Sequence, residues 1–138
     1  MSGLCFVDTS AWYARIVKED FFHDSAVRFA ADFAGSFLTT NYVLLETTNL
    51  LHLRQGYSTA KRFLEIIQES QLLSIHNVTP EDHSVSVQLF LQNKRHVSLT
   101  DCSSFMVMRK LEIENAFTFD QDFARSGFSC LPDHARRE

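Results

Sequence analysis

Short apolar runs alternate with longer helical segments along this chain, and this alternation constrains the fold more than any other feature. The first run, Leu4–Val7, is followed by Asp8-Thr9-Ser10, residues that favour the start of a helix. Further strands are predicted at 36–40, 71–78 and 116–119, and helices at 24–33, 41–53, 58–68, 80–91 and 99–111. Strands that alternate with helices form a parallel sheet with helices on both faces. We therefore predict an α/β fold.

The length of 138 residues suits one compact domain and is too short for two ordinary ones. A single domain over residues 1–138 is expected. The hydrophobic fraction of 45% and the 13 Phe residues indicate a well-packed globular protein. No apolar run approaches the ~20 residues of a membrane span, and the chain start lacks the basic and apolar regions of a signal peptide. We expect a soluble, cytoplasmic protein without a membrane segment.

The three cysteines, Cys5, Cys102 and Cys130, lie far apart and form no C-x-x-C pair. This pattern favours buried free thiols over a disulfide framework or a zinc site. The net charge of -4 argues against a protein that coats nucleic acid non-specifically. It does not exclude an enzyme acting on nucleic acid, because a cation bound among acidic residues would reverse the local field.

Four separated acidic residues occupy comparable positions in the predicted sheet. Asp8 and Asp120 each follow a predicted strand, Asp101 lies in the first turn of helix 99–111, and Glu46 lies near the start of helix 41–53. The carboxyl ends of parallel strands and the starts of the following helices share one edge of such a sheet. We expect all four side chains to face one crevice. Carboxylate oxygens are the ligands that Mg²⁺ and Mn²⁺ prefer.

Each acid also has a purely structural interpretation. Asp8 could cap a helix, and Ser98-Leu99-Thr100-Asp101 matches a capping box. Asp120-Gln121-Asp122 could form a turn. Glu46 lies in a helix predicted to be largely buried, where a carboxylate is costly unless a Lys or Arg on a neighbouring element pairs with it. The four acids together favour a cation site over these separate explanations.

Four segments of the sequence, taken in order, resemble the PIN-domain ribonucleases, and the VapC-type toxins of bacterial toxin–antitoxin pairs are the branch that they resemble. The segments span nearly the whole chain and include all four acids: Phe6-Val7-Asp8-Thr9-Ser10-Ala11-Trp12, Leu45-Glu46, Ser98-Leu99-Thr100-Asp101-Cys102 and Ala116-Phe117-Thr118-Phe119-Asp120.

This resemblance implies a PIN fold with a central parallel sheet and cleavage of RNA phosphodiester bonds. It implies Mg²⁺ or Mn²⁺ held by Asp8, Glu46, Asp101 and Asp120, which would activate a water for attack on the phosphate. It also implies a homodimer, and a small antitoxin protein that covers or enters the acidic site.

Three further positions have roles implied by the resemblance. Ser10 and Thr118 match small hydroxyl positions that help to orient ligands or waters, and Asp122 either replaces or assists Asp120 as the fourth acidic ligand. The RNA backbone must also be bound, and the sequence does not say which basic residues face the site. The candidates are Arg15, Lys18, Arg54, Lys61, Arg62, Lys94, Arg95 and Arg109.

Two rival functions are weighed against a ribonuclease. An aspartate-based phosphatase also places Asp after its first strand, but it usually needs a second Asp two residues later, where this chain has Ser10. A non-catalytic binding module with the same fold would be expected to have lost an acid, and none is missing. Trp12 and Tyr13 could stack on a base, although aromatic residues just after a strand more often belong to the core.

Overall fold

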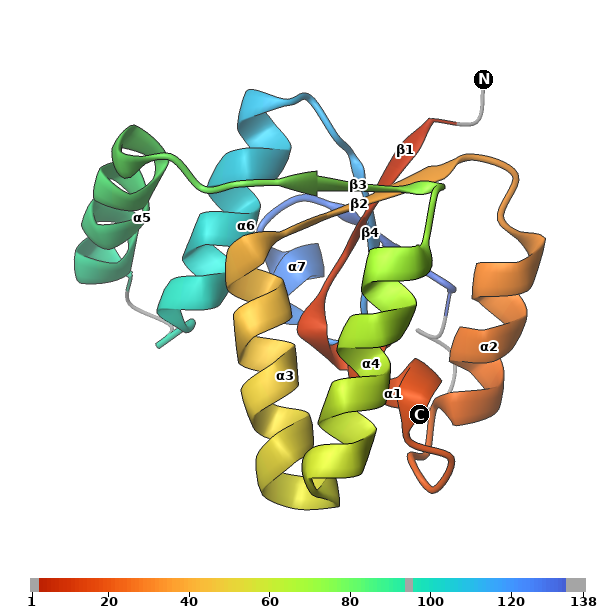
Figure 1. Ribbon diagram of the computed structural model, residues 1–138. Coiled ribbons are helices and arrows are strands. Elements are labelled where there is room, and N and C mark those ends of the chain that lie inside the picture. Colours follow the sequence, from red (N-terminus) through yellow and green to blue (C-terminus); the bar gives the residue numbers. More distant parts are fainter. Residues whose placement is uncertain (1–2, 94–95, 134–138) are drawn as a thin grey trace.

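The computed structural model describes residues 3–93 and 96–133 and contains a five-stranded, fully parallel sheet (Figure 1). The strand order is β3-β2-β1-β4-β5. The strands are β1 (Leu4–Val7), β2 (Ser36–Thr40), β3 (Leu73–His76), β4 (Asn115–Phe117) and β5 (Ser129–Leu131). The predicted α/β fold with a central parallel sheet is therefore confirmed.

The helices occupy both faces of this sheet. From β1 to β3 the chain moves in one direction along the sheet, and right-handed crossovers place the helices of this part on one face (Figure 1). From β3 the chain returns past β2 and β1 to β4 and β5, which places the later helices on the other face. The crossovers diverge between β1 and β4, where open parallel sheets bind their ligands. The helices are α1 (Thr9–Ile16), α2 (His23–Asp32), α3 (Asn41–Gln55), α4 (Tyr57–Glu69), α5 (Pro80–Gln92), α6 (Leu99–Lys110) and α7 (Asp122–Arg125).

The central strand β1 lies in the middle of the core, because helices cover both of its faces. Its residues Cys5, Phe6 and Val7 are all buried. On one side Phe6 packs near Phe123 of α7, with ring centroids 6.4 Å apart. On the other side Trp12 of α1 meets the Phe63 ring of α4 edge-on at 5.6 Å. Aromatic packing therefore fixes the helices on each face relative to the sheet.

Local signals explain where α3 begins and ends. The Thr40 side chain accepts a hydrogen bond from the Val43 backbone at 3.0 Å, which caps the helix start. The helix ends at Gly56, as predicted, and the φ of 97° at this position favours glycine. The expectation that this helix is largely buried is wrong, because Leu45 and Leu53 are 62% and 83% exposed.

Two predicted strands are too long, and two elements escaped prediction. β3 covers only Leu73–His76. β4 ends at Phe117 instead of Phe119, because the chain after Phe117 turns toward α1, where the Phe119 backbone donates to Ser10 Oγ. The short elements α7 and β5 lack the several residues of periodicity that a prediction needs. None of the helices that the structure describes is long and apolar enough to cross a membrane.

The cysteines are free thiols, as expected, although Cys130 is only partly buried while Cys5 and Cys102 are buried. Burial raises the pKa of Cys5 to about 12. A thiol that stays protonated at neutral pH is a poor nucleophile and a poor metal ligand. Nothing in the structure therefore assigns the described cysteines a role beyond that of free, largely buried thiols.

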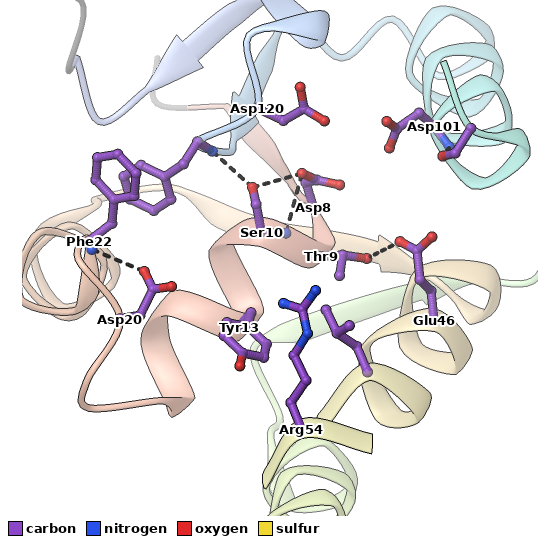
Figure 2. A pocket seen from close by; sticks show the side chains of 13 residues that line it. Asp8, Thr9, Ser10, Tyr13, Asp20, Phe22, Glu46, Arg54, Asp101 and Asp120 are labelled. Carbon is purple, nitrogen blue, oxygen red and sulfur yellow. Dashed lines mark hydrogen bonds between the residues drawn. The ribbon is translucent and has the colours of Figure 1, made fainter. Parts of the chain in front are cut away.

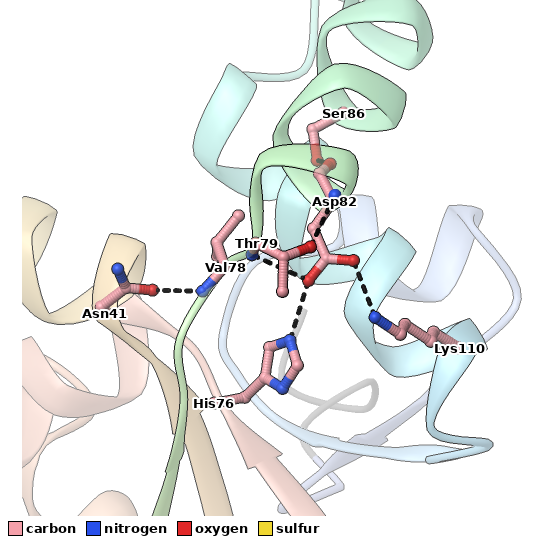
Figure 3. A network of polar contacts seen from close by, with 7 residues as sticks. All are labelled: Asn41, His76, Val78, Thr79, Asp82, Ser86 and Lys110. Atoms are coloured by element: carbon pink, nitrogen blue, oxygen red, sulfur yellow. Dashed lines mark hydrogen bonds and ion pairs between the residues drawn. The ribbon is translucent and has the colours of Figure 1, made fainter.

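A buried aspartate, Asp82, joins three elements next to the sheet (Figure 3). Its carboxylate accepts hydrogen bonds from the Thr79 backbone at 3.1 Å, from His76 Nε2 at 2.9 Å and from Lys110 Nζ at 2.9 Å. The Thr79 side chain in turn accepts from the Asp82 backbone at 3.0 Å, which completes a capping box at the start of α5. These bonds connect β3, α5 and α6.

We expect Asp82→Ala to lower the free energy of unfolding by about 2 to 4 kcal/mol, because it removes the carboxylate half of the capping box and the hydrogen bonds from His76 and Lys110. Burial raises the pKa of Asp82, but the hydrogen bonds from His76, Lys110 and Thr79 outweigh it and hold the pKa well below its ordinary value. These hydrogen bonds therefore stabilise the folded state fully at pH values above the ordinary pKa of an aspartate, and this stabilisation is lost as the pH falls toward the lowered pKa of Asp82.

Urea unfolding of the wild-type protein and of Asp82→Ala, at pH 7 and at a series of lower pH values, tests this expectation. The exposed neighbour Glu81 provides a matched control, and Glu81→Ala should change the unfolding free energy by less than about 0.5 kcal/mol. Equal effects of the two substitutions would contradict the assigned role of Asp82.

Candidate functional site

A cavity of about 450 Å³ opens at the carboxyl edge of the sheet, where the crossovers diverge (Figure 2). It collects side chains from α1, the connection between α1 and α2, α3, the start of α6 and the segment after β4. All four acids predicted from the sequence line it. The lining residues are Asp8, Thr9, Ser10, Tyr13, Asp20, Phe22, Glu46, Leu50, Arg54, Ser98, Asp101, Phe119 and Asp120.

Asp8 lies at the base of the cavity and is only 2% exposed. It caps α1, as its position suggested, and its Oδ2 accepts from the Ser10 backbone at 3.4 Å. The same oxygen also accepts from the hydroxyl groups of Ser10 and Thr118, each at 2.9 Å. Burial raises the pKa of Asp8 to about 6; the two hydroxyl bonds oppose this shift and the nearby charge of Asp120 adds to it.

The two hydroxyl groups also connect the start of α1 to the segment that follows β4. The Phe119 backbone donates to Ser10 Oγ at 2.9 Å, and the Asp120 backbone donates to Thr118 Oγ1 at 3.0 Å. Ser10 and Thr118 therefore both orient the Asp8 carboxylate and position the backbone that carries Asp120. The hydroxyl positions suggested by the resemblance thus contact a predicted ligand directly.

Glu46 faces the cavity from the second turn of α3 (Figure 2). Its Oε1 accepts a hydrogen bond of 2.6 Å from the Thr9 hydroxyl. Thr47 donates to the same Thr9 oxygen at 3.3 Å, so the donor is itself held in place. The partner of Glu46 is therefore a hydroxyl group and not the Lys or Arg considered from the sequence.

Asp101 lies in the first turn of α6 and is 9% exposed. Its backbone donates to Ser98 Oγ at 3.0 Å, which is one half of the predicted capping box. The other half, a bond from the Ser98 backbone to the Asp101 carboxylate, is absent, whereas both halves are present at Thr79 and Asp82. The capping role thus leaves the Asp101 carboxylate free to face the other acids of the cavity.

The charge of Asp101 is strongly disfavoured in this environment. Burial, followed by the negative charges of Asp8, Asp120, Glu46 and Asp122, raises its pKa to about 9. A carboxylate in such a position needs a positive charge nearby in order to stay ionised at neutral pH.

Asp120 and Asp122 both approach Asp101. Each of the three offers one carboxylate oxygen, and these oxygens lie within 4.8 Å of one another. The Asp122 backbone donates to Asp120 Oδ1 at 2.9 Å, which fixes their relative position. Asp120 lines the cavity, while Asp122 lies beside it and forms an ion pair of 2.9 Å with Arg125. The turn expected at Asp120-Gln121-Asp122 therefore coexists with a cluster of acids.

The chemistry of the donor groups fits a hard divalent cation. The cluster presents carboxylate oxygens and has no thiol or imidazole among its three members. A divalent cation accepts such ligands, and its charge would offset the repulsion that raises the pKa of Asp8 and Asp101. Two of the four acids predicted from the sequence, Asp101 and Asp120, belong to this cluster together with Asp122, whereas Asp8 and Glu46 line the same cavity outside it.

Several residues of the cavity wall were missed or left unassigned from the sequence. Phe22 stacks on Phe119 with ring centroids 4.4 Å apart and 10° between the planes. Asp20 accepts from the Phe22 backbone at 3.0 Å. These residues lie in connecting segments, where no periodicity indicates which way a side chain points. Tyr13 lines the cavity, whereas its neighbour Trp12 belongs to the core.

Comparison with known proteins places this geometry in a family. Residues 5–129 match the PIN domain. The chain is 36% identical over 126 residues to the 23S rRNA-specific endonuclease VapC20 of Mycobacterium tuberculosis, in the CDC 1551 / Oshkosh and ATCC 25618 / H37Rv strains. This similarity covers 91% of the chain and 95% of the relative.

Solved structures agree with the sequence match. The crystal structure of M. tuberculosis VapC20, described as a sarcin–ricin loop cleaving toxin, superimposes with a TM-score of 0.85 and 34% identity, over 90% of this chain and 95% of the other. VapBC2 from Rickettsia felis, bound to a DNA fragment from their promoter, shares the fold with a TM-score of 0.65 and 13% identity, over 92% and 96% of the two chains. The chain described here belongs to the PIN-domain family and to its VapC-type branch.

Proposed function

We propose that this protein is an endoribonuclease that depends on a divalent cation and serves as the toxin of a toxin–antitoxin pair. The observation that carries the proposal is the convergence of Asp8, Asp101 and Asp120 on one cavity despite their mutual repulsion. A fold that keeps such an arrangement gives up stability, which is typical of a functional site. The relationship to VapC20 supports the choice of RNA as the substrate.

The residues proposed to hold the cation, Mg²⁺ or Mn²⁺, are Asp8, Glu46, Asp101 and Asp120, with Asp122 as an additional candidate. When bound, such a cation supplies Lewis-acid stabilisation of the phosphate and of the charge that develops on the leaving oxygen. Asp101 and Asp120 lie close enough to act on one ion. Glu46, further along the wall, is suited to hold a water by hydrogen bonding.

The protein itself contributes fixed directions for these carboxylates. Ser10 and Thr118 hold Asp8 by two hydroxyl bonds, and Thr9 holds Glu46 by one. Supporting bonds of this kind keep ligands within the narrow geometry that catalysis needs. Asp8 directly follows β1, Asp101 lies in the first turn of α6 and Glu46 lies in the second turn of α3, so regular elements of the fold position these three carboxylates.

Both rival functions fit the site less well. In an aspartate-based phosphatase Asp8 would attack phosphorus, yet two hydroxyl groups and a backbone N–H already occupy its Oδ2. The position two residues later holds Ser10, whose hydroxyl group supports Asp8 and cannot replace an acid. A binding module would not need four acids in one cavity, because each one weakens the binding of a polyanion.

We propose ribosomal RNA as the substrate class, and the sarcin–ricin loop of 23S rRNA as the first RNA to test. The reason is the 36% identity to a 23S rRNA-specific endonuclease and the match to a structure described as a sarcin–ricin loop cleaving toxin. Ribosomal RNA is cytoplasmic, so the protein is proposed to act there.

The proposed partners are a cognate antitoxin and a second copy of the chain. An antitoxin is proposed because the related VapC20 is described as a toxin, which a cell must be able to silence. The surface offers exposed apolar side chains that a protein partner could cover, among them Leu45 and Leu53 on α3. Size measurement of the purified protein, alone and co-expressed with the product of a neighbouring gene, tests both partners.

Cleavage of RNA should require the cation and the cavity acids. We expect the purified protein to cleave a sarcin–ricin stem-loop with Mg²⁺ or Mn²⁺ and to be inactive with a chelator. Asp8→Asn and Asp120→Asn should each lower the cleavage rate by roughly 100-fold or more, and Thr118→Val by about 10- to 100-fold through the orientation of Asp8. Gel analysis of end-labelled RNA measures all of these rates.

The control for this experiment is Asp24→Asn, which removes an exposed acid on α2 outside the cavity. It should leave the rate unchanged. A folded Asp8→Asn variant with full activity would falsify the proposed site. Cleavage of other RNAs but not of the stem-loop would refute only the proposed target.

Removal of one repelling charge should stabilise the protein in the absence of metal. The raised pKa of Asp101 means that the folded state binds a proton more tightly than the unfolded state does, so metal-free stability falls as the pH rises from about 4 toward 9. We expect Asp101→Asn to raise the unfolding free energy at pH 8 by at least about 1 kcal/mol, or the melting temperature by about 3 °C or more.

Melting curves with a chelator at pH 5 and pH 8 measure this effect, which should be smaller at pH 5. Addition of Mg²⁺ should raise the melting temperature of the wild-type protein more than that of Asp101→Asn. If Asp101→Asn is less stable than wild type at pH 8 with a chelator, Asp101 has a structural role that this interpretation overlooks.

The fourth acidic position can be assigned by comparing two variants. Asp120 lines the cavity, whereas Asp122 is already paired with Arg125. We therefore expect Asp120→Asn to raise the dissociation constant for Mn²⁺ at least about tenfold, and Asp122→Asn to raise it less. Titration of Mn²⁺ followed by electron paramagnetic resonance measures both constants. The opposite order would assign the position to Asp122.

A further inference from the structure

Arg54 is the only Lys or Arg that lines the acidic cavity among residues 3–93 and 96–133. It lies in the last turn of α3, two turns beyond Glu46 on the same helix. Figure 2 shows its side chain extending from α3 into the space beside Tyr13, across the cavity from Asp120. The other lining residues with a charge are the acids Asp8, Asp20, Glu46, Asp101 and Asp120.

The guanidinium group of Arg54 is positioned by an aromatic ring. It lies over the Tyr13 ring, 5.7 Å from the centroid, which is a cation–π contact between α3 and α1. The Tyr13 hydroxyl accepts a hydrogen bond of 3.2 Å from the side-chain amide of Gln55, the next residue in α3. None of the ion pairs between described residues includes Arg54. The cation is thus pre-positioned while its N–H groups stay available.

We propose that Arg54, positioned by Tyr13, binds a phosphate of the RNA next to the scissile bond; this inference rests on the proposed ribonuclease function. A polyanion that enters a cavity with five acids meets repulsion except where a cation is present. A bound metal ion would offset the repulsion at Asp101 and Asp120, but not on the opposite wall. There a planar guanidinium group can donate two parallel bonds to one phosphate.

A structural role for Arg54 is the competing explanation. A positive charge in the last turn of a helix is stabilised by the helix dipole, and stacking on Tyr13 could serve packing alone. That role predicts a loss of stability when Arg54 is replaced, and no change in the affinity for RNA. A phosphate contact predicts a change in RNA affinity that depends on salt and is the same for different RNA sequences.

The test measures RNA binding in the Asp101→Asn background, in which cleavage is expected to be absent. The probes are the sarcin–ricin stem-loop and a stem-loop of the same length with a scrambled loop. With Mg²⁺ present and KCl varied, Arg54→Ala should raise the Kd of both probes about five- to tenfold and reduce the slope of log Kd against log salt by roughly 0.7 to 0.9.

Four further variants separate the effects of the charge of Arg54, the geometry of its contacts and the overall charge of the protein. Arg54→Lys should restore the salt slope but only part of the affinity, because an ammonium group donates no parallel pair of bonds. Tyr13→Phe keeps the ring under Arg54 and should weaken RNA binding less than Tyr13→Leu, which removes the ring. Arg28→Ala, which removes an exposed cation on α2 outside the cavity, should leave the Kd and the slope unchanged.

The outcomes separate this inference from the proposed function. If wild-type protein cleaves RNA but Arg54→Ala lowers only the melting temperature, with the same Kd and salt slope, Arg54 is a structural residue and the inference is wrong. An equal loss of affinity in Arg28→Ala would also overturn it, because the effect would then come from overall charge. Absence of cleavage by the wild-type protein with either cation would instead count against the ribonuclease function.

Discussion

The buried carboxylate of Asp8 is the point on which the geometry of the site depends. A charge placed out of contact with water needs hydrogen-bond donors, and Asp8 obtains two of them from Ser10 and Thr118. The Thr118 backbone N–H donates to the Leu131 carbonyl of β5 at 3.0 Å, and Ser10 lies in the first turn of the helix that carries Tyr13. The requirement to satisfy one carboxylate therefore fixes how the start of α1, the end of β4 and the edge strand meet.

Two other buried aspartates lie in the part of the chain that the structure describes, and the contrast between them separates stability from function. Asp82 is surrounded by donors, so its charge is favourable and joins β3, α5 and α6. Asp101 occupies an equivalent place at the start of the next helix, but acids surround it in place of donors. At this position Asp82 stabilises the start of α5. At the same position of α6, Asp101 holds a carboxylate whose charge is unfavourable unless a positive charge lies nearby. Such a site costs folding energy in return for affinity toward a cation.

Sequence patterns were sufficient for the elements with several turns or a continuous apolar run, and for the acids that follow them. Asp8 and Glu46 could be assigned to one edge because strand ends and helix starts share that edge in a parallel sheet. The donor of Glu46 could not be predicted, since Thr9 meets it only after α1 packs on α3. Arg54 was one of eight candidate cations that the sequence could not rank, and Phe22 was not predicted at all. The place of Arg54 in the cavity depends on the angle of a helix end, and that of Phe22 on a connection without periodicity. The exposure of Leu45 and Leu53 depends on which neighbours cover α3, and composition does not contain that information.

The order of the strands has a consequence for biosynthesis. Asp8 and Thr118 are 110 positions apart, and Val7 pairs with Phe117 in the centre of the sheet. A ribosome must therefore translate beyond Asp120 before the acids can meet, and pairing over so many residues is slow compared with the formation of local helices. A nascent chain, or a product truncated before β4, lacks Phe119 and Asp120 of the cavity wall and also Thr118, which donates a hydrogen bond to Asp8. The acidic cavity is therefore complete only when synthesis of this domain is nearly finished.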